Sequence, residues 1–281
     1  MDHLAGMAPL APRYEGFILD LWGVIHDGVR PYPGAVKVME RLRARDRRVV
    51  LLSNAPRRAI AVARGMTAMG IPPELYDGVM TSGEAIYEGL FTRADPWFAR
   101  LGRRAFWLGP PRDLPLLEGL DIDIALRPED ADFVLNIGAD EAVSATEIAP
   151  HVPALEACRR AELPMLCANP DLVIVREGQR ILCAGALAEV YAGMGGEVVQ
   201  RGKPDAAIYP PTLALLGVPP ERVLVVGDAL RTDIAGAAAV GLESCWVLGG
   251  IHDLVGRTAE AEAEAAAAGL APIATIPSFV W

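Results

Sequence analysis

GFILDLW (residues 16–22), GAVKVMERLRARD (34–46), RVVLLSN (48–54) and PRRAIAVARGMTAMG (56–70) follow one another near the start of the chain. The first and third segments are apolar runs of strand length, and the second and fourth have the apolar spacing of helices. Strands that alternate with helices in this way predict an α/β fold with a doubly wound parallel sheet. The polar residues that end the two strands, Asp20 and then Ser53 with Asn54, are the first candidates for a site.

The same alternation returns late in the chain. DAAIYPPTLALLG (205–217) predicts a helix, RVLVVGD (222–228) a strand, TDIAGAAAVG (232–241) a helix and ESCWVLGG (243–250) a strand, with a closing alanine-rich helix near 258–268. We therefore predict one core domain from residues 1–82 and 200–281. Residues 83–199 are less regular and are predicted to form an inserted α/β domain. Within them, LVIVREGQRIL (172–182) predicts a hairpin in which Glu177, Gly178 and Gln179 interrupt two strands, and so antiparallel structure unlike the core.

Composition narrows the classes of function. The chain has 281 residues and a formal net charge of −10, which disfavours nucleic acid or an anionic membrane as the main partner. No segment has the length of a membrane span, and the first residues lack a secretory pattern, so a cytoplasmic protein is expected. The four cysteines show no CxxC spacing and are expected to be buried thiols.

Four polar positions follow predicted strands or begin predicted helices. In open parallel sheets, ligands bind outside the carboxyl ends of the strands, so such positions are site candidates. Asp20 ends a buried strand, where apolar packing does not explain a charged side chain. A single aspartate at such a place nevertheless more often caps a turn. Ser53 and Asn54 can cradle phosphate oxygens where a strand meets a helix, but they are also ordinary residues at a helix start.

Lys203 and the pair Asp228 and Asp233 complete the set. Only Lys37 and Lys203 among the 26 basic residues are lysines, and the segment Gly202-Lys203-Pro204 suits a tight anionic contact. Asp228 ends an apolar strand and Asp233 lies at the start of a helix predicted to begin near Thr232. Two carboxylates at a strand end suit Mg²⁺, although Asp233 could instead cap its helix.

In order and spacing, these positions resemble the four sequence motifs of the haloacid dehalogenase-like (HAD) hydrolases. The long interval between Ser53 and Lys203 places the inserted domain as in the type IIA, or NagD-like, group. The resemblance implies a Mg²⁺-dependent phosphatase in which Asp20 forms an aspartyl-phosphate, with Lys203 as a further catalytic residue. It further implies a small phosphorylated metabolite as substrate, such as a sugar phosphate or a nucleotide, and raises a homodimer as a candidate assembly.

The resemblance also implies the site roles. Ser53, Asn54 and Lys203 would bind phosphate, and the metal would be held by Asp20, the backbone carbonyl of Trp22, Asp228 and Asp233.

Trp22 departs from the family pattern. The phosphatases of the family usually carry an aspartate there, which protonates the leaving group, and an indole cannot do so. Three explanations stay open: His26 or Asp27 supplies the proton, the leaving group needs none, or turnover is very slow. Each of the two side chains taken alone is more often an ordinary turn residue. The alternatives in other classes are a protein that binds a phosphorylated ligand without catalysis and, with less support, a haloacid-type dehalogenase.

Overall fold

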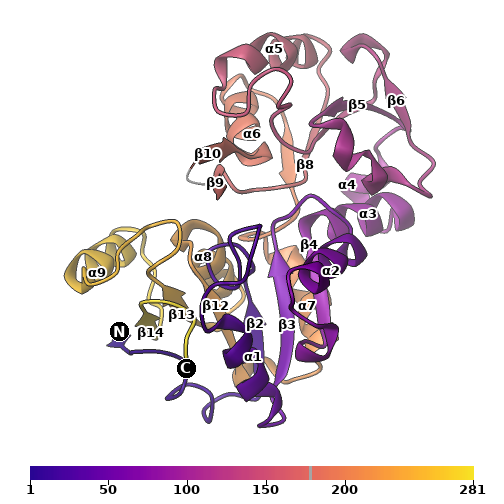
Figure 1. Cartoon of the computed structure of the whole chain (residues 1–281). Helices are drawn as coiled ribbons and strands as arrows, with labels where there is room; N and C mark the ends of the chain where they lie inside the picture. Colours follow the sequence, from indigo (N-terminus) through magenta and orange to yellow (C-terminus); the bar gives the residue numbers. More distant parts are fainter. Residues whose placement is uncertain (177–178) are drawn as a thin grey trace. The chain divides into compact units, whose positions relative to one another are not determined.

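The computed structural model describes residues 1–176 and 179–281, and these residues form two compact units (Figure 1). The first unit comprises Met1–Ser53, Ile60–Met80 and Lys203–Trp281, and the second comprises Asn54–Ala59 and Thr81–Gly202. Each unit has a parallel sheet and a hydrophobic core of its own. The chain therefore has the α/β, Rossmann-like fold that its strand and helix pattern predicts.

A seven-stranded sheet forms the first unit, in the order β1-β14-β13-β12-β2-β3-β4. From β1 to β3, every neighbouring pair is parallel. Its strands are β1 (Asp2–His3), β2 (Gly16–Leu19), β3 (Arg48–Ser53), β4 (Gly78–Thr81), β12 (Val223–Gly227), β13 (Glu243–Val247) and β14 (Ala274–Ile276). The helices of this part of the chain are α1 (Ala35–Arg43), α2 (Ala59–Ala68), α7 (Tyr209–Leu216), α8 (Ala235–Ala239) and α9 (Thr258–Ala267).

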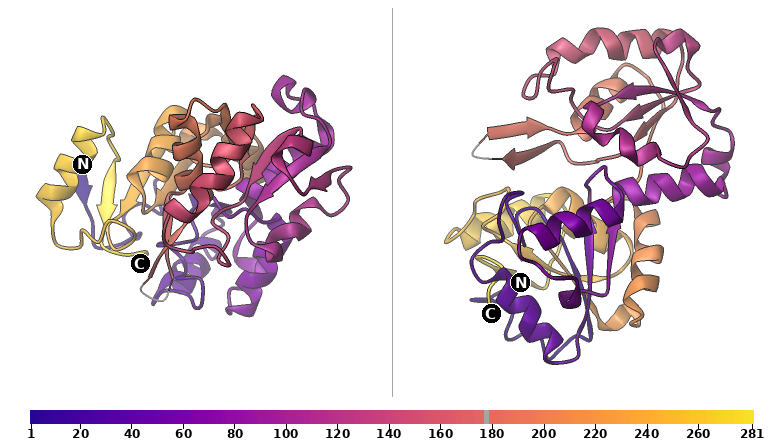
Figure 2. Two further views of the ribbon diagram at one scale, coloured as in Figure 1. Left: turned by 90° about the horizontal axis from the view of Figure 1, so that it is seen from above. Right: turned by 45° about the vertical axis from the view of Figure 1, so that its right-hand side comes forward.

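The central strands are apolar along their whole length because both faces of the sheet are covered. All four residues of β2 and all five of β12 are buried. Helix α1 packs against β3, and α7 packs against β2 and β3. Met7 donates its N–H to the carbonyl of Val280 at 2.7 Å, so the two ends of the chain lie side by side (Figure 2).

The second unit contains a five-stranded parallel sheet in the order β11-β8-β7-β5-β6 and a separate two-stranded sheet. The larger sheet consists of β5 (Arg104–Leu108), β6 (Asp123–Ala125), β7 (Phe133–Asn136), β8 (Met165–Cys167) and β11 (Val198–Gln200). The helices are α3 (Ser82–Thr92), α4 (Pro96–Ala99), α5 (Val152–Arg160) and α6 (Ala184–Gly193).

The predicted hairpin is present as the antiparallel pair β9 (Val173–Arg176) and β10 (Gln179–Leu182). Gln179 pairs with Arg176, so its expected place between the strands is wrong, because the strand already begins there. Glu177 and Gly178 lie outside the described residues. The expectation of antiparallel structure holds for this hairpin only, since the main sheet of the unit is parallel.

The segment Asn54–Ala59 belongs with the second unit, whereas the sequence pattern groups it with the core. The start of α3 holds this segment: Thr81 donates its hydroxyl to the carbonyl of Arg57 at 2.5 Å, and the carboxylate of Glu84 accepts from the N–H of Ala59 at 2.8 Å. In the part of the chain that the structure describes, no helix combines the length and the apolar character that a membrane span requires.

Candidate active site

Three neighbouring strands of the first unit end in the predicted polar residues. Asp20 follows β2, Ser53 ends β3, and Asp228 follows β12. Because β12, β2 and β3 are adjacent and parallel, their carboxyl ends meet at one edge of the sheet. The register places Leu19, just before Asp20, beside Val226.

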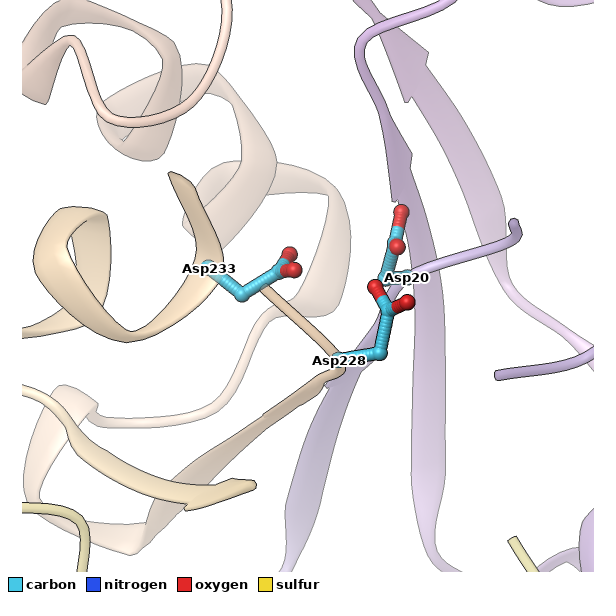
Figure 3. A group of neighbouring side chains, drawn as sticks. All are labelled: Asp20, Asp228 and Asp233. Carbon is cyan, nitrogen blue, oxygen red and sulfur yellow. The ribbon is translucent and has the colours of Figure 1, made fainter. Parts of the chain in front are cut away.

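The carboxylates of Asp20, Asp228 and Asp233 converge at this edge (Figure 3). Each offers an oxygen, and these oxygens lie within 4.8 Å of one another. All three residues are buried, with exposed fractions of 8%, 6% and 1% respectively. This is the only group of three or more potential metal-binding side chains among residues 1–176 and 179–281.

Lys203 joins two of these acids. Its ammonium donates to Oδ1 of Asp20 at 2.6 Å and to Oδ1 of Asp233 at 2.7 Å, and the lysine is itself 2% exposed. The structure thus brings together Asp20, Lys203 and the pair Asp228 and Asp233, which come from three separate parts of the sequence. Charge-assisted hydrogen bonds of this kind fix the positions of both carboxylates.

The electrostatics of the group favour an additional cation. Burial raises the pKa of Asp20 well above its ordinary value, and the charge of Asp233 raises it further, while Lys203 acts in the opposite direction. One ammonium faces three buried carboxylates, so negative charge is in excess. A divalent ion that takes oxygen ligands, such as Mg²⁺, suits this donor set in charge and in chemistry.

Asp228 is held firmly in place. Its Oδ2 accepts the N–H of Ile251 at 2.7 Å, and its backbone carbonyl accepts the indole N–H of Trp246 at 2.9 Å. A Cβ atom added at Gly23 or at Gly250 would lie 2.0 Å from Oδ2 of Asp228, so both positions need glycine. Sequence reasoning missed Trp246 and Gly250. The double glycine that ends ESCWVLGG was the available signal for the second of them.

Asp233 lies inside a π-helical turn, Leu230–Ile234, that leads into α8. The helical segment therefore begins at Leu230, two residues before the predicted start at Thr232. Oδ2 of Asp233 accepts the N–H of Ala229 at 3.1 Å, while its Oδ1 accepts from Lys203. The side chain holds the turn and also faces the carboxylate group.

Ser53 and Asn54 are both buried, with 1% and 3% of their surface exposed. Ser53 ends β3 in the first unit, whereas Asn54 is counted with the second unit. There the amide of Asn54 donates to Oδ1 of Asp171 at 2.9 Å. This contact orients the Asn54 side chain within its own unit.

Trp22, His26 and Asp27 lie on the turn that follows β2. The Trp22 ring packs over Gly28, so closely that a Cβ added at Gly28 would come within 2.1 Å of the ring. The His26 ring packs edge-on against the Trp22 ring, with 5.4 Å between the two ring centroids. Nδ1 of His26 accepts the N–H of Gly28 at 2.9 Å, and burial lowers the pKa of His26 to about 4. The imidazole is therefore neutral at physiological pH.

Asp27 closes the same turn. Its Oδ1 accepts the N–H groups of Arg30 at 2.8 Å and of Val29 at 2.9 Å, and these hydrogen bonds lower its pKa. Its carboxylate is therefore ionised at neutral pH. His26 and Asp27, the two candidate proton donors, thus both make hydrogen bonds to the backbone of the turn.

Comparison with known proteins shows the family of the chain. The family model described as haloacid dehalogenase-like hydrolase matches residues 17–123, and a second model, HAD-hydrolase-like, matches residues 200–273. A solved hydrolase of the haloacid dehalogenase-like family from Brucella suis is 30% identical, covers 99% of this chain and 100% of its own, and superposes with a TM-score of 0.86.

Two further relatives carry specific names. Chronophin from Bos taurus is 29% identical over 269 residues, which make up 89% of this chain and 86% of chronophin. The solved glycerol phosphate phosphatase of Mycobacterium tuberculosis, in complex with calcium, is 26% identical with a TM-score of 0.64. That match covers 86% of this chain and 68% of the mycobacterial protein.

Proposed function

The chain belongs to the haloacid dehalogenase-like hydrolases, in their NagD-like group, and on this premise we propose that it is a divalent-metal-dependent phosphatase acting on a small phosphorylated metabolite. The observation that carries the proposal is the pair of hydrogen bonds from Lys203 to Asp20 and Asp233. They hold Asp20 within the group of three carboxylates, at the end of a central strand. A nucleophilic carboxylate requires this kind of fixed position.

The names of the relatives support the substrate class. The mycobacterial relative is a glycerol phosphate phosphatase, and its structure holds calcium, a divalent cation with oxygen ligands. A more distant match is an acid sugar phosphatase of Staphylococcus aureus, 24% identical over 255 residues. We propose by analogy a sugar phosphate, a nucleotide or a similar small molecule for this chain.

Asp20, Asp228, Asp233 and the backbone carbonyl of Trp22 would hold Mg²⁺. When bound, the ion would supply positive charge that lets an anionic phosphate approach the Asp20 carboxylate. The buried carboxylates, with a single ammonium among them, fit that role.

The residues of the chain would act in two steps. The Asp20 carboxylate attacks phosphorus while the bond from phosphorus to the ester oxygen breaks, which gives an aspartyl-phosphate and the free alcohol or its anion. Water then attacks this intermediate, releasing inorganic phosphate and restoring the carboxylate. Ser53 and Asn54 would bind phosphate oxygens, and the Lys203 ammonium would offset their charge throughout transfer. We assign substrate selection to the inserted unit, Thr81–Gly202, as the cap of the enzyme.

One observation favours a second candidate function. Because residue 22 is tryptophan, the chain could bind a phosphorylated ligand without turning it over. This reading predicts that a phosphate ester raises the melting temperature while no inorganic phosphate is released. A dehalogenase has less support, since halide departure does not need the acidic group that Asp228 and Asp233 form with Asp20.

A phosphate-release screen tests the proposal. The panel comprises sugar phosphates, nucleotides, glycerol phosphate and an aryl phosphate, each with Mg²⁺ and with a chelator. We expect release only with the metal, and none from Asp20→Asn, whose amide keeps the shape of the side chain but lacks its nucleophilicity. Equal release by wild type and Asp20→Asn would reject Asp20 as nucleophile, and turnover of a 2-haloacid in chelator would point to the dehalogenase.

A further inference from the structure

The side chains of the turn after Asp20, the proposed nucleophile, limit which phosphate esters the site can hydrolyse. Breaking the bond between phosphorus and an alkyl oxygen produces an alkoxide, which is a strong base comparable to hydroxide. Such a leaving group needs a proton in the transition state, and a positioned acid provides roughly a hundredfold to ten-thousandfold in rate. An enzyme that hydrolyses alkyl phosphates therefore needs an acid close to its nucleophile.

Trp22 lies two residues after Asp20, on the turn that follows β2. Its ring is fixed, because it covers Gly28 so closely that a Cβ there would come within 2.1 Å of the ring, and because His26 packs against it edge-on. The indole N–H does not release a proton near neutral pH. Trp22 therefore fills this position without acid-base chemistry.

The other polar side chains of the turn are already engaged. The carboxylate of Asp27 accepts two backbone N–H groups of its own loop, and its oxygen also lies 3.7 Å from the Arg30 guanidinium. The His26 ring is 4% exposed and accepts the N–H of Gly28. Within residues 20–30, all of which the structure describes, no side chain is placed as a free carboxylic acid.

The remaining charged groups beside Asp20 already make hydrogen bonds or would bind the metal. The Lys203 ammonium donates to the Asp20 and Asp233 carboxylates, and Asp228 accepts from the backbone of Ile251. Asp228 and Asp233 would be metal ligands in the proposed enzyme, and a ligand carboxylate carries no proton to give. These residues thus provide a nucleophile and positive charge, but none of them is placed as a proton donor for the leaving oxygen.

We infer that the site acts on phosphates whose leaving group departs as a stable anion, namely aryl, enol or acyl phosphates. The inference rests on the proposed phosphatase function, and among small phosphorylated metabolites it disfavours the alkyl esters that the names of the relatives suggest. A phenolate or a carboxylate is the conjugate base of an acid with a pKa of about 10 or about 4, so neither needs protonation to leave. Alkyl phosphates, including glycerol phosphate and most sugar phosphates, become poor substrates.

The reaction balances without an external acid. An Asp20 oxygen forms a bond to phosphorus while the bond from phosphorus to the leaving oxygen breaks, and the electron pair stays on that oxygen. Water then attacks phosphorus, and the bond to Asp20 breaks. One aryl phosphate dianion and one water give one phenolate and one dihydrogen phosphate, with both protons of water retained on the phosphate.

The two bases of the turn, Asp27 and His26, already accept hydrogen bonds from its backbone, so we expect activation of the water to be poor and the second step to be slow relative to the first. An aryl phosphate should therefore release phenolate in a burst of about one equivalent per active site, followed by slower turnover. Turnover in the steady state should be similar for different aryl phosphates, because they share the aspartyl-phosphate. The specificity constant kcat/KM, which reports the first step, should depend on the leaving group.

The first test compares wild-type enzyme, with Mg²⁺, on 4-nitrophenyl phosphate, phenyl phosphate, acetyl phosphate and glycerol phosphate. We expect kcat/KM to fall at least 100-fold from 4-nitrophenyl phosphate to glycerol phosphate, with phenyl phosphate between them. Values for these three esters within about threefold of one another would overturn the inference while leaving the phosphatase proposal intact. Failure to hydrolyse any of the four compounds would instead remove the phosphatase proposal.

The second test restores an acid. In Trp22→Asp, we expect the ratio of kcat/KM for glycerol phosphate to that for 4-nitrophenyl phosphate to rise about 100-fold. Trp22→Asn is the matched control, because it has nearly the same shape without a transferable proton, and its ratio should stay near that of wild type. An unchanged ratio in a folded Trp22→Asp, or an equal rise in Trp22→Asn, would contradict the inference. The wild-type comparison keeps it falsifiable if Trp22→Asp does not fold.

Discussion

The indole N–H of Trp246 donates to the backbone carbonyl of Asp228 at 2.9 Å, across the paired strands β12 and β13. The Trp246 ring is fully buried, and the His252 ring packs edge-on against it with 5.2 Å between the ring centroids. Nδ1 of His252 in turn lies 3.1 Å from the Glu264 carboxylate on α9. A chain of contacts thus fixes the backbone from which one proposed metal ligand extends.

Replacing Trp246 by Phe should weaken metal binding. Phenylalanine keeps a smaller aromatic ring, but the hydrogen bond, worth about 1 kcal/mol, is lost, which corresponds to roughly a fivefold rise in the dissociation constant for Mg²⁺. Calorimetric titration with Mg²⁺ measures this directly. Trp97→Phe is the control, because the Trp97 indole donates to Glu197 in the second unit. Equal affinities in wild type and Trp246→Phe would show that the Trp246 contact does not position Asp228.

Lys203 should be essential for stability as well as for catalysis. Lys203→Met leaves Asp20 and Asp233 without their shared ammonium in a buried place, and breaking such a pair costs about 3 kcal/mol. Urea unfolding in the presence of a chelator measures this loss. Adding Asp233→Asn to Lys203→Met should restore part of it, because one uncompensated charge is removed. A double variant as unstable as Lys203→Met would argue against charge as the cause.

The buried His26 predicts a loss of stability in mild acid. Burial lowers its pKa from 6.5 to about 4 in the folded protein, so between these values the unfolded chain binds a proton that the folded protein does not. Above pH 6.5 this difference in proton binding disappears and does not affect the free energy of unfolding. It should lower the free energy of unfolding by about 1.4 kcal/mol per pH unit as the pH falls to 4, about 3 kcal/mol in all.

His26→Asn isolates this effect, since its amide oxygen can accept the N–H of Gly28 without titrating. The measurement is the difference in unfolding free energy between wild type and variant from pH 7 to pH 4. We expect the difference to shift in favour of His26→Asn as the pH falls. A difference that is constant over this range would exclude a lowered pKa of His26.

Divalent ions should stabilise the folded protein. The three buried carboxylates repel one another, and ligand binding to the folded state alone adds about 2.7 kcal/mol at a concentration 100 times the dissociation constant. We expect MgCl₂ to raise the melting temperature of wild type relative to chelator, and to have much less effect on Asp228→Asn. The same rise in both would place the stabilising ion elsewhere.

The positions of Asp20 and Asp228 could be predicted because each ends a run of apolar residues that is long enough to mark a buried strand. Trp246 could not, because its role depends on a hydrogen bond to the neighbouring strand, and its own segment indicates only a buried strand. Short strands such as β1 and β6, with two and three residues, leave no periodic pattern to detect. The parallel sheet of the second unit could not be predicted either, because its strands are short and the hairpin pattern indicated antiparallel structure.

The two glycines that enclose Asp228 limit how this site can change. A Cβ atom at Gly23 or at Gly250 would lie 2.0 Å from Oδ2 of Asp228, so this carboxylate has little space around it for an added methylene. Glutamate at 228, otherwise a mild exchange, should therefore be among the least tolerated substitutions. Library selections for a different metal preference would do better to vary the surrounding oxygen donors and leave this aspartate and its two neighbours untouched.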